Sequence, residues 1–151
     1  MDSDSFNFHH MKPNLRDLEK IIISAAREEL LPCFALSARQ FKADGSIVTE
    51  ADLTIQHRLK RQLSECWPQI PVLGEEMSEA DQEDCLRHSQ AGVWILDPLD
   101  GTSNFAAGVP CFAVSIALLQ DGEIQCGLVY DPLRDECFTA WKGEGARLNG
   151  G

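Results

Sequence analysis

The stretch Trp94–Phe105 of this 151-residue chain has the sequence WILDPLDGTSNF, in which an apolar run leads directly into two aspartates. The run is typical of a buried strand. Asp97 and Asp100 follow it with only two residues between them. Two neighbouring carboxylates repel each other and resist joint ionisation unless a cation or a shared proton lies between them. The stretch therefore predicts a buried strand whose end holds a metal ion or a proton.

The residues around the two aspartates favour the metal ion. Hard divalent cations bind carboxylate oxygens and backbone carbonyls, so the Leu99 carbonyl can add a ligand to Asp97 and Asp100. Gly101 has no side chain to keep a phosphate away. If Thr102 begins a helix, the first N–H groups of that helix form an anion site. The pattern indicates metal-assisted hydrolysis of a phosphoester by a water nucleophile.

Two other classes of aspartate-rich site do not fit this spacing. Haloacid dehalogenase enzymes form a covalent aspartyl phosphate at a D-x-D-G-T motif, and here Leu99 occupies the position of their second aspartate. A calcium-binding EF-hand loop needs ligands at its third and twelfth positions, which here are Leu99 and Gly108. Both classes are therefore excluded.

The pattern along the rest of the chain predicts an α+β fold, with two helices packed on a largely antiparallel sheet. We expect, in order, a helix over 14–40 kinked or divided at Pro32, a short strand at 47–49, a helix over 50–66, a strand that ends at Glu75–Glu76, a surface loop or short helix at 78–90, a strand over 92–96, and three strands within 111–120, 123–131 and 136–143. Asn14 is the expected helix cap, and Asp121–Gly122 the expected hairpin turn. No further helix or strand is predicted after the turn at 143–146.

Composition and charge limit the function classes. Hydrophobic residues make up 44% of the chain, which indicates a folded domain with its own core. A net charge of −11 argues against a nucleic-acid partner, because phosphate polyanions require a basic surface. No apolar run reaches the length of a membrane span, and the polar residues 1–13 predict a flexible tail. The six cysteines contain no C-x-x-C pair, so we expect reduced thiols in the cytoplasm.

Further carboxylates fall at the ends of other predicted elements. Asp52 is expected in the first turn of the second helix, and Glu75 and Glu76 at the end of a strand. Taken singly, each has a structural explanation: Asp52 complements a helix dipole, and the glutamates form a solvated strand end. Taken together with Asp97 and Asp100, they favour a magnesium site.

Three sequence blocks carry a resemblance to a known family. They are KADGSIVTEAD at 42–52, GEE at 74–76 and WILDPLDGTSNF at 94–105, followed by a weaker VYDP, KGEGA and LNG series. In these blocks the chain resembles the inositol monophosphatase family, the lithium-sensitive, Mg²⁺-dependent sugar phosphatases. The resemblance implies that residues 14–151 form the metal-binding N-terminal half of the sugar-phosphatase αβαβα sandwich.

The resemblance also implies metal ligands. Glu75, Asp97 and the Leu99 carbonyl would hold a first Mg²⁺, and Asp97 and Asp100 would share a second. Glu75, with Glu76 nearby, would help to bind a weaker third ion. Lithium is expected as an inhibitor.

Catalytic roles follow from the same resemblance. Thr102, hydrogen-bonded to Asp52, would orient or deprotonate the attacking water, and Glu75 would act with them through the metal. The N–H groups of Gly101 and Thr102 would hold phosphate oxygens. Lys42 occupies the position of a family lysine on a loop near the metals, although an exposed loop lysine is an equally ordinary interpretation.

The chain departs from the family pattern in length. Family members continue for about another domain, with a W-D-x-A-A-G block and most of the residues that contact the sugar. These 151 residues contain no such block, so we expect the C-terminal domain to be absent, the activity of the chain alone to be low, and an exposed sheet face to favour a homodimer. The expected substrate is inositol phosphate or a related small phosphorylated metabolite, with histidinol phosphate, fructose 1,6-bisphosphate and 3′-phosphoadenosine phosphates left open. The alternative is a non-catalytic half-domain that binds a metal or a partner.

Overall fold

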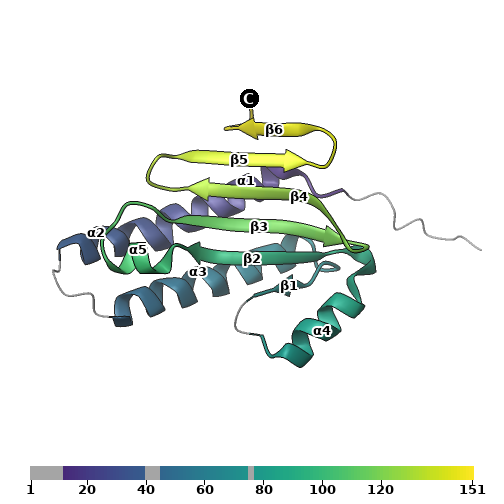
Figure 1. Ribbon diagram of the computed structural model, residues 1–151, viewed down its shortest axis with the longest axis horizontal. Helices are drawn as coiled ribbons and strands as arrows, with labels where there is room; N and C mark the ends of the chain where they lie inside the picture. The colour runs from purple at the N-terminus through teal and green to yellow at the C-terminus, as the bar shows by residue number, and fades with distance from the viewer. Residues whose placement is uncertain (1–11, 40–44, 75–76) are drawn as a thin grey trace, which may run out of the picture.

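Six strands form one sheet in which sequence order is also spatial order (Figure 1). The computed structural model describes residues 12–39, 45–74 and 77–151. β1 runs parallel to β2, and every later neighbour is antiparallel. The strands are β1 (Val72–Leu73), β2 (Val93–Asp100), β3 (Ala113–Gln120), β4 (Glu123–Asp131), β5 (Glu136–Trp141) and β6 (Gly145–Leu148).

The helices lie mainly on one side of this sheet. They are α1 (Leu15–Ala25), η2 (Ala26–Leu30), α2 (Leu31–Arg39), α3 (Gly45–Cys66), α4 (Glu79–Arg87), η3 (Ser89–Ala91) and α5 (Thr102–Ala106). α1 contacts β4 and β5, while α3 contacts β1 and β2. Figure 1 shows both long helices behind the sheet. The α+β prediction of two helices on a largely antiparallel sheet is confirmed. No helix of the described segments is long and apolar enough to cross a membrane.

The first helical run begins where the sequence predicts, but instead of dividing at Pro32 it continues from Leu15 to Arg39 through a π turn. Asn14 is its N-cap, and its side chain accepts a hydrogen bond from the Arg16 N–H at 2.9 Å. A π-helical turn, η2, precedes α2, and the Leu31 N–H bonds back to the Ala26 carbonyl. Pro32 has no N–H, and its ring would clash with a carbonyl one turn earlier in a regular helix. The wider π turn, followed by Pro32 in the first turn of α2, lets the chain pass this residue without a break.

The predicted strand at 47–49 is wrong, because α3 already begins at Gly45. The β-branched residues there have a high strand propensity, but within the described chain every strand begins at Val72 or later, so they have no strand to pair with. α3 instead buries Ala51, Ile55, Leu59 and Leu63, one residue per turn. Asp52 consequently lies well inside the helix rather than in its first turn.

The hairpin prediction is confirmed and a last strand is added. Asp121 and Gly122 both have positive φ angles, 51° and 77°, as a two-residue turn between twisted strands requires. The expectation of no strand after residue 146 is wrong, because β6 pairs with β5 over Gly145–Leu148. The Asn149 side chain closes this pairing by accepting from the Cys137 N–H at 2.8 Å. All four residues of β6 are exposed, so its sequence lacks the alternation of apolar and polar residues from which a half-buried strand is predicted.

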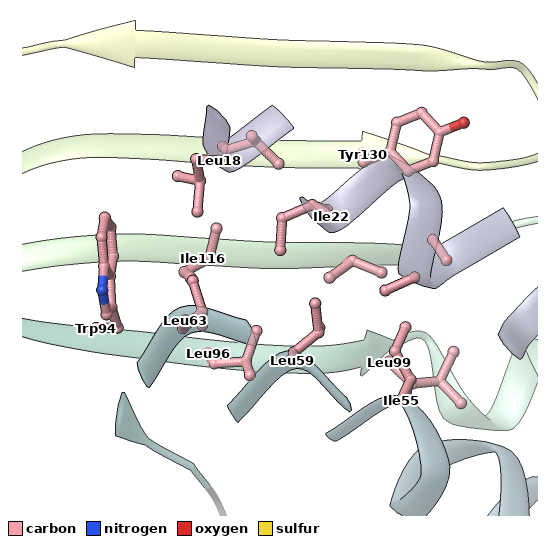
Figure 2. Close-up of a cluster of buried hydrophobic side chains, with 14 of the residues drawn as sticks. Leu18, Ile22, Ile55, Leu59, Leu63, Trp94, Leu96, Leu99, Ile116 and Tyr130 are labelled. Carbon is pink, nitrogen blue, oxygen red and sulfur yellow. The ribbon is translucent and has the colours of Figure 1, made fainter. Parts of the chain in front are cut away.

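The core fills the space between the helices and the sheet (Figure 2). Side chains from α1 and α3 meet side chains from β2, β3 and β4 there. The ten residues labelled in Figure 2 are all at most 3% exposed: Leu18, Ile22, Ile55, Leu59, Leu63, Trp94, Leu96, Leu99, Ile116 and Tyr130. Each large apolar side chain buried in this way stabilises the fold by about 1.5–3 kcal/mol. Two residues of the predicted tail are also ordered, since Pro13 is buried and the Lys12 ammonium lies 2.7 Å from Glu144.

Arg58 ties α3 to the first helical run. Its guanidinium donates to Glu28 at 2.7 Å, to Glu29 at 3.0 Å and to the Ser24 hydroxyl at 2.9 Å. The Arg58 side chain is only 15% exposed. Its guanidinium holds the pKa of Glu28 below the ordinary value of 4.5. Because the π turn brings Glu28 and Glu29 to the same partner, one arginine fixes the spacing of the two helices.

Replacing Arg58 by methionine, which keeps an unbranched apolar stem, should lower the free energy of unfolding by about 1–3 kcal/mol, because Glu29 would lose its partner. Arg61→Met is the matched control. Its exposed pair with Glu65, at 3.9 Å, should contribute no more than about 0.5 kcal/mol. Urea unfolding at neutral pH measures the free energy of unfolding of both variants. Equal decreases in the two variants would contradict the proposal that Arg58 holds the two helices together.

The same contact has a pH signature. A lowered pKa in the folded state means that Glu28 adds stability above its unfolded pKa of about 4.5. That stability is lost as the pH falls through the lower pKa of the folded state. Arg58→Met should therefore flatten the decline in stability below about pH 4.5, in urea midpoints measured across that range.

The cysteines divide by burial into reactive and protected thiols. All six lie in described segments and are free. Burial raises the pKa of Cys126 to about 11 and that of Cys137 to about 12, whereas Cys66 and Cys111 are exposed. At mildly alkaline pH a disulfide reagent should modify Cys66 and Cys111 within minutes and reach Cys126 and Cys137 only after unfolding. Mass spectrometry of timed samples identifies the sites, and early labelling of Cys137 would refute the assignment.

Candidate metal and phosphate site

A β-bulge at the end of β2 separates the two aspartates from the core. Asp97 pairs with Ser115 and Asp100 with Ala113, so β2 has one residue more than β3 between these pairs. In a regular strand Asp97 and Leu99 would face the same side. The extra residue lets Leu99 enter the core, 3% exposed, while Asp97 stays half-buried and Asp100 exposed. Both carboxylates thus lie outside the core, at one end of one strand.

Two hydrogen bonds hold the bulge in shape. The Asp97 carboxylate accepts from the Leu99 N–H at 3.3 Å, and the Leu99 carbonyl accepts from the Thr102 hydroxyl at 3.0 Å. The carbonyl expected to bind a metal is therefore oriented by Thr102. A carbonyl oxygen has two lone pairs, so this bond leaves one acceptor position.

Gly101 is required by the fold itself. Its backbone is left-handed, with φ 86° and ψ 36°, and it is the N-cap of α5. A Cβ built on it would lie 2.7 Å from the Cys111 carbonyl oxygen. The sequence argument used this glycine only to make room for a phosphate. The structure shows that the close approach of the Cys111 backbone already excludes any side chain.

The predicted helix start at Thr102 is confirmed, and α5 packs against α3. This contact brings the helix that carries Asp52 to the helix that carries Thr102. Asp52 is half-buried and lies well inside α3, so complementation of the helix dipole does not explain it. The hydrogen bond of the Thr102 hydroxyl goes to the Leu99 carbonyl, which the sequence did not predict.

Asn104 is a site-shaping residue that the sequence argument missed. Its side chain donates to the Cys111 carbonyl at 3.0 Å, and its own carbonyl accepts from the Val109 N–H at 2.8 Å. It therefore anchors the loop that lies against Gly101. The sequence contained a signal for this role. Asn104 stands two residues after the expected helix start at Thr102, and an asparagine side chain there readily forms hydrogen bonds with nearby backbone.

Three predicted residues, Lys42, Glu75 and Glu76, lie outside the described residues. The adjoining Gly74 is buried against α3, where an added Cβ would lie 3.1 Å from the Gln56 amide nitrogen. Among the described residues no group of three acidic, histidine or cysteine side chains could hold a metal ion. The described donors at the end of β2 are two carboxylates and one carbonyl, all of them oxygens, which is the donor type that Mg²⁺ prefers.

Comparison with known proteins decides the family. The model of the inositol monophosphatase family matches residues 14–151. The chain belongs to this family. The resemblance noted in the sequence is therefore confirmed.

The similar curated proteins include Nus factors and inositol-1-monophosphatases. The chain is 40% identical over 116 residues to the Nus factor SuhB of Escherichia coli K12, covering 77% of this chain and 41% of that protein. It is 41% identical over 108 residues to an inositol-1-monophosphatase of Mesorhizobium japonicum, covering 72% and 39%. The chain thus spans about two fifths of the length of these curated relatives.

Solved structures of inositol monophosphatases and SuhB proteins share the fold. Inositol monophosphatase II from Staphylococcus aureus matches with a TM-score of 0.72 at 29% identity, covering 91% of this chain and 48% of that one. The extragenic suppressor protein suhB from Bartonella henselae matches with a TM-score of 0.70 at 34% identity, covering 89% and 51%. The described fold therefore corresponds to about half of each solved chain.

The backbone requirement at Gly101 can be isolated by a matched pair of substitutions. Gly122→Ala introduces a side chain at a positive φ with nothing within 4 Å, and should cost about 1 kcal/mol. Gly101→Ala adds the overlap with the Cys111 carbonyl and should cost about 3 kcal/mol or more. Urea unfolding measures the difference, and equal costs would show that the Cys111 loop yields freely.

Proposed function

We propose that this chain supplies the metal-bearing part of a Mg²⁺-dependent phosphomonoesterase. The observation that carries the proposal is the bulge in β2, which keeps Leu99 in the core and sets Asp97 and Asp100 outside it. Gly101 and Thr102 follow directly, at the start of α5. Family membership supports a phosphatase, because relatives include inositol-1-monophosphatases.

The donor set fits Mg²⁺. Asp97, Asp100 and the Leu99 carbonyl would hold the ions, with Glu75 as the further ligand that the sequence resemblance implies. When bound, Mg²⁺ lowers the pKa of a coordinated water and neutralises charge on the phosphate. Lithium inhibition belongs to the same proposal.

The chain's own groups orient water and phosphate. The Thr102 hydroxyl donates to the Leu99 carbonyl and keeps lone pairs that can accept a hydrogen bond from water. Asp52, on the adjoining α3, is proposed to take the proton from that water. The N–H groups of Gly101 and Thr102, at the start of α5, are proposed to donate hydrogen bonds to the phosphate oxygens.

The proposed substrate is a small phosphate monoester such as inositol phosphate, acted on in the cytoplasm. Two observations support a small metabolite: the name of the Mesorhizobium relative, and a net charge of −11 that disfavours nucleic acid. Phosphate release should be tested over inositol phosphate, histidinol phosphate, fructose 1,6-bisphosphate and 3′-phosphoadenosine phosphate, with and without lithium. For the 151-residue chain alone we expect little turnover, and robust hydrolysis by a mass-verified sample would refute that expectation.

A second candidate is a non-catalytic module that binds a metal or a protein partner. It is favoured by the 40% identity to a relative named as a Nus factor. Normal folding and association with no phosphate release at saturating Mg²⁺, including in a protein that carries the remaining family length, would favour this candidate.

The proposed metal binding by Asp97 can be tested by comparing the Mg²⁺ affinities of two variants. Asp97→Asn keeps the shape of the side chain but removes the charge proposed to contact two ions, so calorimetric Mg²⁺ affinity should fall about tenfold or more, that is, by about 1.4 kcal/mol. Glu76→Gln, at a position assigned only to a weaker site, is the control and should change affinity less. Equal effects of the two substitutions would count against the assignment.

A further inference from the structure

Gln56 is a polar residue buried on α3. It is 4% exposed, and Thr139 is the other buried polar residue of the described segments. Within those segments no hydrogen bond joins the Gln56 amide to another residue. An amide that loses its bonds to water without gaining others weakens a fold. Stability alone therefore does not explain a glutamine at this position.

The Gln56 amide faces Gly74, the residue that follows β1. A Cβ built on Gly74 would lie 3.1 Å from the Gln56 amide nitrogen and 3.7 Å from the Cε of Lys60. Gly74 is not among the glycines with a positive φ, so its backbone conformation does not itself require a glycine. The missing side chain instead leaves room for the amide, and the two residues are fitted to each other.

Three polar residues form a row along α3. Asp52, Gln56 and Lys60 are four residues apart, so they lie on the same side of the helix. Asp52 is proposed above to take a proton from the attacking water. Gly74, at the other end of the contact, directly precedes Glu75, the metal ligand that the sequence resemblance implies. Gln56 therefore connects the helix of the proposed base to the chain that enters a proposed ligand.

β1 leads toward the same end of the sheet as the two aspartates. It runs parallel to β2 with Leu73 opposite Ile95, and Asp97 is two residues further along β2. α3 contacts both strands and passes behind them in Figure 1. The carbonyl of Gly74 accepts a hydrogen bond from the Met77 N–H at 3.3 Å. Gly74 is thus fixed by the amide on one side and by a backbone hydrogen bond on the other.

We propose that Gln56 is a positioning residue of the metal site, whose buried amide fixes Gly74 and so sets where the chain enters the ligand assigned to Glu75. Groups behind a metal ligand orient it, and their loss typically costs about 10–100-fold in metal affinity. An amide supplies two donors without a positive charge that would repel the cation. This inference rests on the Mg²⁺ site of the proposed function and adds a residue to it.

Calorimetric Mg²⁺ titration of the full chain tests the proposal with Gln56→Met, which keeps the length of the side chain and removes its donors. The affinity should fall about tenfold or more. The urea midpoint of the metal-free protein should not fall, because methionine buries no unpaired polar group. A glutamine with a purely structural role would give the reverse result, a lower urea midpoint with unchanged Mg²⁺ affinity.

Two matched variants separate the amide from other effects. Thr139→Val removes the other buried polar group, on β5, which β3 and β4 separate from β2, and should leave the Mg²⁺ affinity unchanged. Lys60→Met alters the same contact with Gly74 but removes a positive charge, so it should raise the affinity or leave it unchanged. A tenfold loss of affinity in either control would overturn the role assigned to the amide.

The contact between Gln56 and Gly74 can be tested without metal. Gly74→Ala should lower the urea midpoint, since the new Cβ would press on the amide. In the Gln56→Ala background the space is free, so the same substitution should lower the midpoint clearly less. Additive effects of the two substitutions would overturn the proposal. Gly74→Ala displaces the amide and should also weaken Mg²⁺ binding about tenfold, which keeps the test decisive if Gln56→Met does not fold.

The Mg²⁺ titrations distinguish failure of this inference from failure of the proposed function. No Mg²⁺ binding by the unsubstituted chain would refute both. Mg²⁺ binding that neither Gln56→Met nor Gly74→Ala weakens would refute the positioning role alone and leave the proposed function standing.

Discussion

The extra residue of β2 between Asp97 and Asp100 is the constraint on which the site depends. Proline cannot donate to a sheet ladder, and Pro98 would interrupt a regular central strand. The register shift against β3 absorbs it. Because side chains alternate along a strand, the same shift decides which of the neighbouring residues face the core. The burial of Leu99 and the position of both carboxylates outside the core, with Asp97 half-buried and Asp100 exposed, thus follow from the same register shift.

The residues after the bulge keep this arrangement from relaxing. The Thr102 hydroxyl holds the Leu99 carbonyl, and the backbone of Cys111 lies so close to Gly101 that no side chain fits. Asn104 ties the same loop to α5. These contacts are hydrogen bonds or steric contacts with backbone atoms. They therefore restrict the conformation of the bulge and of the loop at Cys111 more than they stabilise the fold. Preorganised oxygen donors are what a metal-dependent site requires, since little reorganisation then accompanies binding.

Local signals in the sequence were sufficient for much of the fold. The cap at Asn14 and the hairpin at Asp121–Gly122 each depend on the conformational preference of one or two residues, and both were predicted correctly. Pro32 was expected to kink or divide the first helix, but the helical run continues past it after a π turn. The segment 47–49 was not, because β-branched residues form a strand only where a neighbouring strand exists. β6 was missed for the complementary reason: it pairs with β5 although no side chain in it is buried. At the site, the metal chemistry inferred from the aspartate spacing stays a prediction. The hydrogen bond from Thr102 to the Leu99 carbonyl depends on the bulge and could not be foreseen from the sequence.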